Sequence, residues 1–102
     1  MDMHDLKFED ERFDLVFARD VFEHAVAPFV VFSEMARVSK KYVLIILPDD
    51  TWGKSPLHIS IPTLKQMVVL GMKQDMGLCL YDEAYHIAVD IPFKEYYYVF
   101  RK

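Results

Sequence analysis

The chain has 102 residues, of which 53% are apolar and 15% aromatic, and its formal net charge at pH 7 is −4. This length suits one domain, residues 1–102, and the apolar content excludes a disordered chain. The acidic balance disfavours a nucleic-acid partner, because phosphate binding needs a basic surface. No apolar run reaches the roughly 20 residues of a membrane span, and Cys79 is the single cysteine. These features predict a cytoplasmic protein without an intrachain disulfide or a membrane partner.

The first half of the chain predicts a strand, a helix and a second strand. Residues 13–18 are a short apolar run, the pattern of a strand buried on both faces. Pro28 suits the first turn of a helix, where no backbone N–H is needed, and apolar residues recur at helical spacing up to Ala36. Residues 42–47 form a second buried strand, which Pro48 ends. This order predicts a βαβ unit with parallel strands.

The second half begins with a long loop, residues 48–62, of a length that is usually functional or mobile in a small domain. Thr63 and Gln66 have the spacing of a capping box and predict the start of a helix that Gly71 ends. The residues expected on the buried side of this helix are Leu64, Met67 and Val68.

Two β-rich runs follow, residues 75–81 and 95–101, and an irregular loop separates them. We expect these runs to pair as antiparallel strands. Met67 and Met72 are expected to fill the core. The sequence therefore predicts an α/β fold in the order β-α-β-α-β-β, in which parallel strands are followed by an antiparallel C-terminal pair.

Several segments occur in an order that a known family shares. Residues 2–25, DMHDLKFEDERFDLVFARDVFEHA, match a pattern in which Asp-x-x-x-Leu-Pro-Phe precedes a strand of the form Phe-Asp-x-Val, with Lys7 in place of the proline. Residues 32–40, FSEMARVSK, carry Glu-x-x-Arg-Val on the expected helix, and residues 93–102, FKEYYYVFRK, match a last antiparallel strand. Together they resemble the second half of a class I S-adenosylmethionine-dependent methyltransferase.

The resemblance implies a partial Rossmann-like sheet, the C-terminal half of the family's fold. The family's glycine-rich turn, which lets the backbone approach the cofactor, has no counterpart, because the only glycines are Gly53, Gly71 and Gly77. The acidic residue that holds the cofactor's ribose is missing as well. We therefore expect a truncated protein. A shortened gene, an incomplete sequence and a genuinely reduced protein are all open explanations.

The same resemblance implies five residues at an S-adenosylmethionine site. Asp2 would accept a hydrogen bond from the adenine amino group, the Met3 backbone N–H would bind the ring, and Leu6 would pack on its face. Ala18 and Arg19 end the first strand, where the cofactor's methionine portion lies in the family. The alternative for Asp2 is a solvated chain terminus.

His24 and Asp20 are the candidate catalytic bases, because methyl transfer can be helped by removal of the acceptor's proton. The alternative for His24 is a structural role with local hydrogen bonds. Trp52 and His58 lie in the long loop, where such enzymes contact substrate, although ordinary loop packing is the favoured explanation. No metal site is expected, because the histidines and carboxylates lack compact ligand spacing.

In the complete family fold the strand at residues 13–18 pairs with a neighbour that has no counterpart here. We expect an unpaired apolar edge, and therefore a homodimer formed through it. Two functional hypotheses follow. The first is a methyltransferase-like protein that is active only if a dimer or partner chain rebuilds the cofactor site. The second is a non-catalytic remnant or homodimeric assembly module. The methyl acceptor is left open among small molecules, lipids, proteins and nucleic acids.

Overall fold

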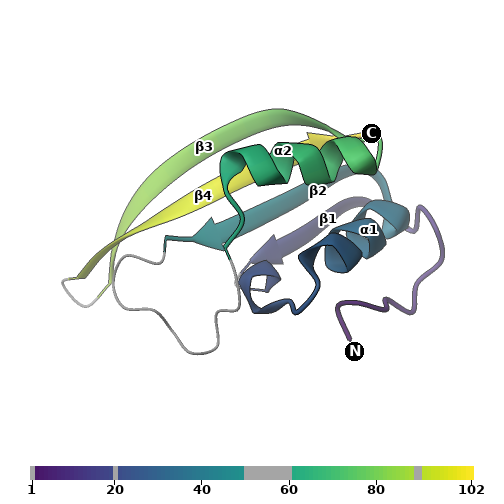
Figure 1. Ribbon diagram of the computed structural model, residues 1–102, viewed down its shortest axis with the longest axis horizontal. Coiled ribbons are helices and arrows are strands. Elements are labelled where there is room, and N and C mark those ends of the chain that lie inside the picture. Colours follow the sequence, from purple (N-terminus) through teal and green to yellow (C-terminus); the bar gives the residue numbers. More distant parts are fainter. Residues whose placement is uncertain (1, 20, 50–60, 89–90) are drawn as a thin grey trace.

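The computed structural model describes residues 2–19, 21–49, 61–88 and 91–102 (Figure 1). The elements in chain order are β1 (Phe13–Arg19), the short 3-10 helix η1 (Phe22–His24), α1 (Pro28–Val38), β2 (Ser39–Pro48), α2 (Leu64–Lys73), β3 (Gly77–Ala88) and β4 (Ile91–Arg101). The predicted order β-α-β-α-β-β is confirmed. No helix in the described ranges is long and apolar enough to cross a membrane.

The four strands form one sheet in the order β1-β2-β4-β3. β1 and β2 are parallel, with Ala18 opposite Ile45 and Arg19 opposite Ile46. β4 is antiparallel to both β2 and β3, so the predicted antiparallel pair is confirmed. β1 is an outer strand of this sheet, as expected from the missing neighbour of residues 13–18.

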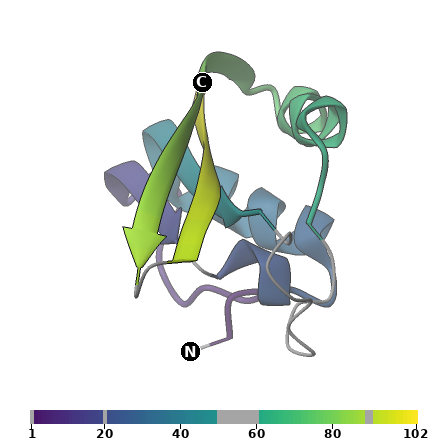
Figure 2. The ribbon, with the colours of Figure 1, turned by 90° about the vertical axis from the view of Figure 1, so that its left-hand side faces the viewer.

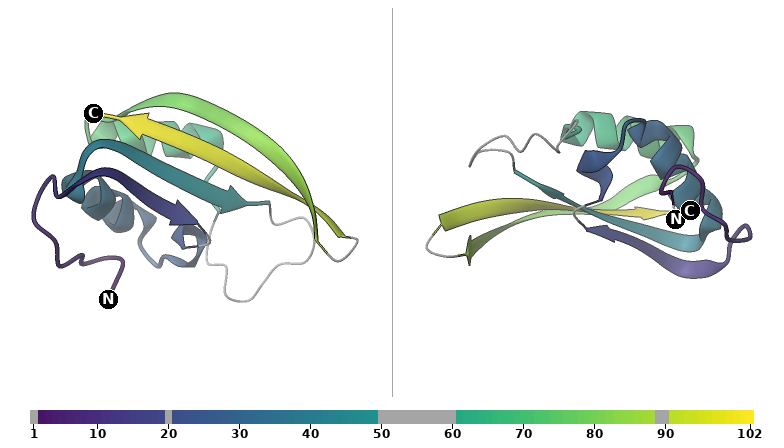
Figure 3. Two further views of the ribbon diagram at one scale, coloured as in Figure 1. Left: turned by 180° about the vertical axis from the view of Figure 1, so that it is seen from behind. Right: turned by 90° about the horizontal axis from the view of Figure 1, so that it is seen from below.

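Both helices cover the same face of the sheet (Figure 2). Seen from behind, the sheet lies in front of the helices, and no described helix covers its other face (Figure 3). The core lies between the helices and the sheet. Phe32 of α1 and Phe100 of β4 are fully buried there, in a T-shaped contact with ring centroids 4.9 Å apart. Alternate residues of β2, which are also buried, complete this layer: Val43, Ile45 and Leu47.

The two helices begin where the sequence predicts. Pro28 occupies the first turn of α1. Before α2, the Thr63 hydroxyl accepts a hydrogen bond from the Gln66 N–H at 3.2 Å, and the Gln66 side-chain oxygen accepts one from the Thr63 N–H at 2.8 Å. This reciprocal pair is the predicted capping box, and it satisfies backbone N–H groups that have no partner within the helix.

The prediction that residues 13–18 are buried on both faces is wrong. Leu15 and Phe17 are 51% and 54% exposed, because their face of β1 is the one that carries no described helix. Val16 and Ala18 alternate with them and face the helices, and Ala18 is buried.

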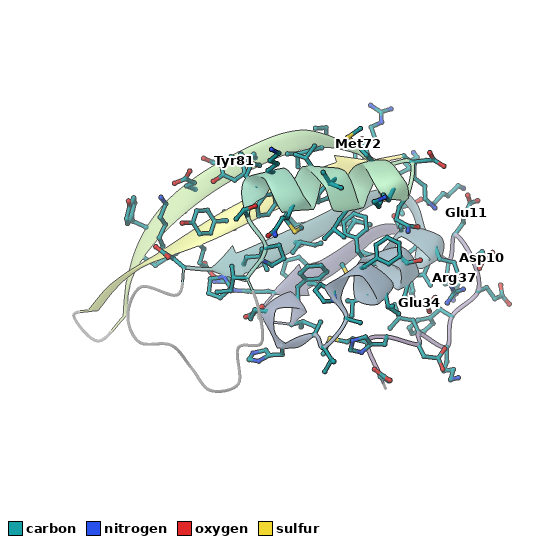
Figure 4. All side chains as sticks on the ribbon, in the orientation of Figure 1. Asp10, Glu11, Glu34, Arg37, Met72 and Tyr81 are labelled. Carbon is teal, nitrogen blue, oxygen red and sulfur yellow. The ribbon has the colours of Figure 1, made fainter. Side chains whose placement is uncertain are left out.

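Three expectations for α2 are also wrong. Leu64 is 42% exposed at the first position of the helix. Met72 is 68% exposed and points away from the sheet (Figure 4), so it does not fill the core as Met67 does. Gly71 does not end the helix, which continues to Lys73. Instead Gly71 is buried where α2 passes close to Phe100.

The segment predicted as an irregular loop between the last strands is strand. β3 extends to Ala88 and β4 starts at Ile91, with His86 opposite Phe93. β2 ends in register with Glu95, and it includes Pro48. The hairpin before Glu95 is therefore a two-stranded ribbon that projects past the sheet (Figure 1). Asp82, Glu83 and His86 interrupt the apolar pattern at the start of this segment, so the sequence did not predict a strand there.

Candidate functional site

Three of the residues predicted to contact a cofactor line one cavity beside β1. This cavity has a volume of about 340 Å³, and it lies between the N-terminal segment, β1 and α1. Met3 and Leu6 reach it from the N-terminal segment, and Ala18 reaches it from the end of β1. The other lining residues are apolar as well, among them Phe13, Val16, Val21, Val31 and Met35. The structure thus brings together residues far apart in the chain around an apolar space.

Two residues of α1 hold the N-terminal segment against the helix (Figure 4). A Glu34 carboxylate oxygen accepts a hydrogen bond from the Leu6 N–H at 2.9 Å. The Arg37 guanidinium donates to the carbonyl oxygens of Leu6 and Phe8 and to the Asp10 carboxylate, each at 2.8 Å, and also to Glu34. Hydrogen bonds from Arg37, followed by the one from Leu6, lower the pKa of Glu34, so the carboxylate is ionised at neutral pH. The Glu-x-x-Arg pair therefore fixes the segment that lines the cavity.

Asp2 lies outside the cavity lining and is exposed. Its carboxylate accepts hydrogen bonds from the His4 N–H at 2.9 Å and contacts His4 Nδ1 at 3.0 Å. These bonds lower the pKa of Asp2, mainly through the backbone N–H. His4 Nε2 in turn accepts a hydrogen bond from the Ala27 N–H at 3.1 Å, which ties the segment to the start of α1. No pattern in the sequence pointed to this role of His4.

Arg19, the fifth predicted cofactor residue, contacts a buried carboxylate. Its guanidinium lies 2.8 Å from Glu95 Oε1, and Glu95 is only 3% exposed. His86 Nε2 lies 2.9 Å from the same oxygen, and the Tyr97 hydroxyl donates to it at 3.1 Å. Burial, and then the Glu95 carboxylate, raise the pKa of Tyr97. We refer to Arg19, His86, Glu95 and Tyr97 as the Glu95 cluster.

The sequence did not reveal the Glu95 cluster, because its members come from three strands whose order was unknown. The one signal was the spacing of Glu95 and Tyr97, which puts both side chains on the same face of a strand. That face is opposite to Tyr98 and Phe100, which are buried under the helices. The cluster therefore lies on the face of the sheet that no described helix covers.

The predicted catalytic and substrate residues are placed only in part. His24 lies in η1, directly after β1, and its Nε2 is 3.9 Å from an oxygen of Glu23, which is 1% exposed. Asp20, Trp52 and His58 lie outside the described residues. Within the described ranges, no group of three His, Cys, Asp or Glu side chains could hold a metal ion.

Comparisons with known proteins agree with this fold. Residues 1–47 match the profile of a family described as a methyltransferase domain. The whole chain superimposes on a protein from Bacillus halodurans C-125, assigned as a methyltransferase, with a TM-score of 0.77 and 14% identity. The chain has a methyltransferase-like fold.

Two further solved structures resemble the methyltransferase-like chain over its full length. A SAM-dependent methyltransferase from Methanosarcina mazei matches with a TM-score of 0.75 and 12% identity. Magnesium protoporphyrin IX methyltransferase from Synechocystis PCC 6803, solved with bound S-adenosylhomocysteine, matches with a TM-score of 0.73 and 9% identity. Identities this low establish a shared fold.

The methyltransferase-like chain is shorter than these proteins. It covers 69% of the Bacillus protein, 65% of the Methanosarcina protein and 49% of the Synechocystis protein. No curated protein matches its sequence significantly.

Proposed function

We propose that the chain forms the adenine-binding half of an S-adenosylmethionine site in a methyltransferase. The observation that carries this proposal is the convergence of Met3, Leu6 and Ala18 on one apolar cavity beside β1. Ligands of open α/β sheets bind outside the carboxyl ends of the strands, which is where Ala18 and Arg19 lie. The Glu34 and Arg37 contacts support the proposal, because they bind the backbone of Leu6 and Phe8 and so hold the segment that carries Leu6 in position before a ligand binds.

The residues present fit part of the cofactor. An apolar cavity suits the faces of the adenine ring, and Asp2, whose pKa is lowered, is an ionised acceptor on the same segment. The sequence has no glycine-rich turn for the methionine and ribose portions, so we propose that another polypeptide segment provides it. When bound, S-adenosylmethionine supplies its methyl group: a bond forms from the acceptor atom to the methyl carbon, the carbon–sulfur bond breaks with its electrons going to sulfur, and the acceptor proton leaves. His24 and Asp20 are the proposed bases for that proton.

The outer strand β1 favours association with another polypeptide chain. Leu15 and Phe17, both more than half exposed, lie on its uncovered face, and the apolar cavity lies beside its unpaired edge. An apolar strand edge favours pairing with another chain. We propose a homodimer through residues 13–18, which would cover this edge. If no cofactor binds, the same surface favours the second function, a non-catalytic homodimeric assembly module.

Isothermal titration of S-adenosylhomocysteine into the chain tests the cofactor proposal. We expect saturable binding with a Kd of about 100 μM or weaker, because only part of the ligand is held. Leu6→Asp should abolish it by placing a carboxylate in the cavity. Leu80→Asp is the matched control, because Leu80 is 52% exposed on β3 and does not line the cavity. If no heat of binding is measured at millimolar S-adenosylhomocysteine, the cofactor proposal is wrong. The non-catalytic assembly module is then the favoured function.

A further inference from the structure

A second cavity lies at the carboxyl end of β2, one strand away from Arg19. Its volume is about 360 Å³. The end of β2 and the entry to α2 form one side, and the β3–β4 hairpin forms the other. The lining residues on which the inference rests are Pro48, Asp49, Pro62, Tyr81, Tyr96 and Tyr98. Arg19, the last residue of β1, is opposite Ile46 of β2. Pro48 therefore lies only two residues beyond the level at which β1 ends. The cavity and the end of β1, where Ala18 and Arg19 lie, thus share one end of the sheet.

Three tyrosine rings line the hairpin side of this cavity. Tyr98 is 2% exposed, and the Tyr81 ring lies 5.2 Å from it and 6.5 Å from the Tyr96 ring, centroid to centroid. Burial raises the pKa of Tyr98 to about 12, and burial with a hydrogen bond to Glu83 raises the pKa of Tyr81. Both phenols are therefore neutral at physiological pH. The cavity presents aromatic groups, which suit a planar ligand.

The charges around the cavity disfavour an anion. Asp49 is the only charged residue among the described residues of the lining. Lys94, two residues before Tyr96 on β4, forms an ion pair with Glu83 and lies over the Tyr96 ring, 5.1 Å from its centroid. That contact is itself evidence that the Tyr96 ring attracts positive charge. A ligand with a protonated amine would find Asp49 and aromatic rings, whereas a carboxylate would face Asp49, and the described part of the lining offers it no cation.

We propose that this cavity binds the methyl acceptor, and that the acceptor is a small aromatic molecule carrying a protonated amine. This assignment of a substrate class rests on the proposed methyltransferase function. Its binding step depends only on residues of this chain, namely the three tyrosines and Asp49.

An NMR titration of the isotope-labelled full chain tests the proposal with three ligands of one shape and different charge. The probes are tyramine, para-ethylphenol and para-hydroxyphenylpropionate, which are cationic, neutral and anionic. We expect tyramine to bind about threefold to tenfold more tightly than para-ethylphenol, with the anion weakest. The shifted resonances should include those of Asp49, Tyr81 and Tyr96. Equal affinities for the three probes, the tightest binding by the anion, or shifts confined to other residues would each overturn the proposal.

Two variants sharpen the test. Asp49→Asn should remove the preference for tyramine over para-ethylphenol while leaving the neutral ligand bound, and retention of the preference would contradict the proposal. Tyr96→Ala should weaken all three probes by about threefold or more, with Tyr85→Ala as control, because Tyr85 is 75% exposed and outside the lining. Since no cofactor is present, failure here is distinguishable from failure to bind S-adenosylhomocysteine.

Discussion

Arg19 and Glu95 join two strands that are not neighbours in the sheet. The guanidinium and the carboxylate lie 2.8 Å apart, although 76 residues separate them and β2 runs between their strands. Glu95 is almost fully buried, whereas the Arg19 side chain is 45% exposed. The contact ties the end of β1, where the cofactor's methionine portion is proposed to lie, to the C-terminal strand.

Glu95→Ala should lower the free energy of unfolding by about 1–3 kcal/mol, because Arg19, His86 and Tyr97 all lose their shared acceptor. Urea denaturation followed by circular dichroism measures this change. Glu83→Ala is the control: Glu83 is 39% exposed, so its loss should lower the free energy of unfolding clearly less than the loss of Glu95 does. A Glu95 variant no less stable than the Glu83 variant would mean that the Glu95 cluster contributes nothing.

Gly71→Ala should destabilise the chain, by about 1–3 kcal/mol, through overpacking. A Cβ at Gly71 would lie 2.7 Å from both the Met76 carbonyl oxygen and the Phe100 ring. Thermal unfolding provides the measurement. Gly77→Ala is a matched control, because nothing lies within 4 Å of a Cβ at Gly77. Equal melting temperatures for the two variants would refute close packing of α2 on Phe100.

The contribution of Glu34 to stability should depend on pH. Its pKa in the folded chain lies below the ordinary value of 4.5, mainly because Arg37 donates to it. Glu34 therefore stabilises the folded chain above about pH 4.5, and this contribution disappears as the pH falls through the folded pKa. Glu34→Gln should cost about 1–2 kcal/mol near neutral pH and progressively less below about pH 4.

Urea denaturation at several pH values tests this dependence. Glu9→Gln is the control, because Glu9 is an exposed carboxylate of the same N-terminal segment. A difference between wild type and Glu34→Gln that stays constant from neutral to acidic pH would rule out the ion pair as its cause.

The proposed homodimer predicts the effect of a charge on β1. Phe17→Glu should convert the dimer to a monomer, because Phe17 is 54% exposed beside the unpaired strand edge. Light scattering coupled to size exclusion measures the mass. Val69→Glu, an exposed position on α2, should leave the dimer intact. A wild-type chain that is monodisperse as a monomer at micromolar concentration would exclude the dimer.

The sequence predicted those features that depend on local signals. Pro28 and the Thr63–Gln66 pair located the starts of both helices, since each acts within one turn. The burial of residues 13–18 was mispredicted, because exposure of Leu15 and Phe17 depends on what covers the sheet and not on the strand itself. Contacts between distant residues were also missed. The resemblance points to the Glu-x-x-Arg motif. The backbone groups of Leu6 and Phe8 that the motif binds are apparent only from the fold.

The position of β4 has a consequence for synthesis of the chain. β4 lies between β2 and β3 and pairs with both of them. Ribosomes make residues 91–101 after every other strand of this sheet. β1, α1 and β2 can associate during translation, but the inner edges of β2 and β3 stay open until β4 emerges. The nascent chain is therefore most prone to aggregate just before its last strand is made.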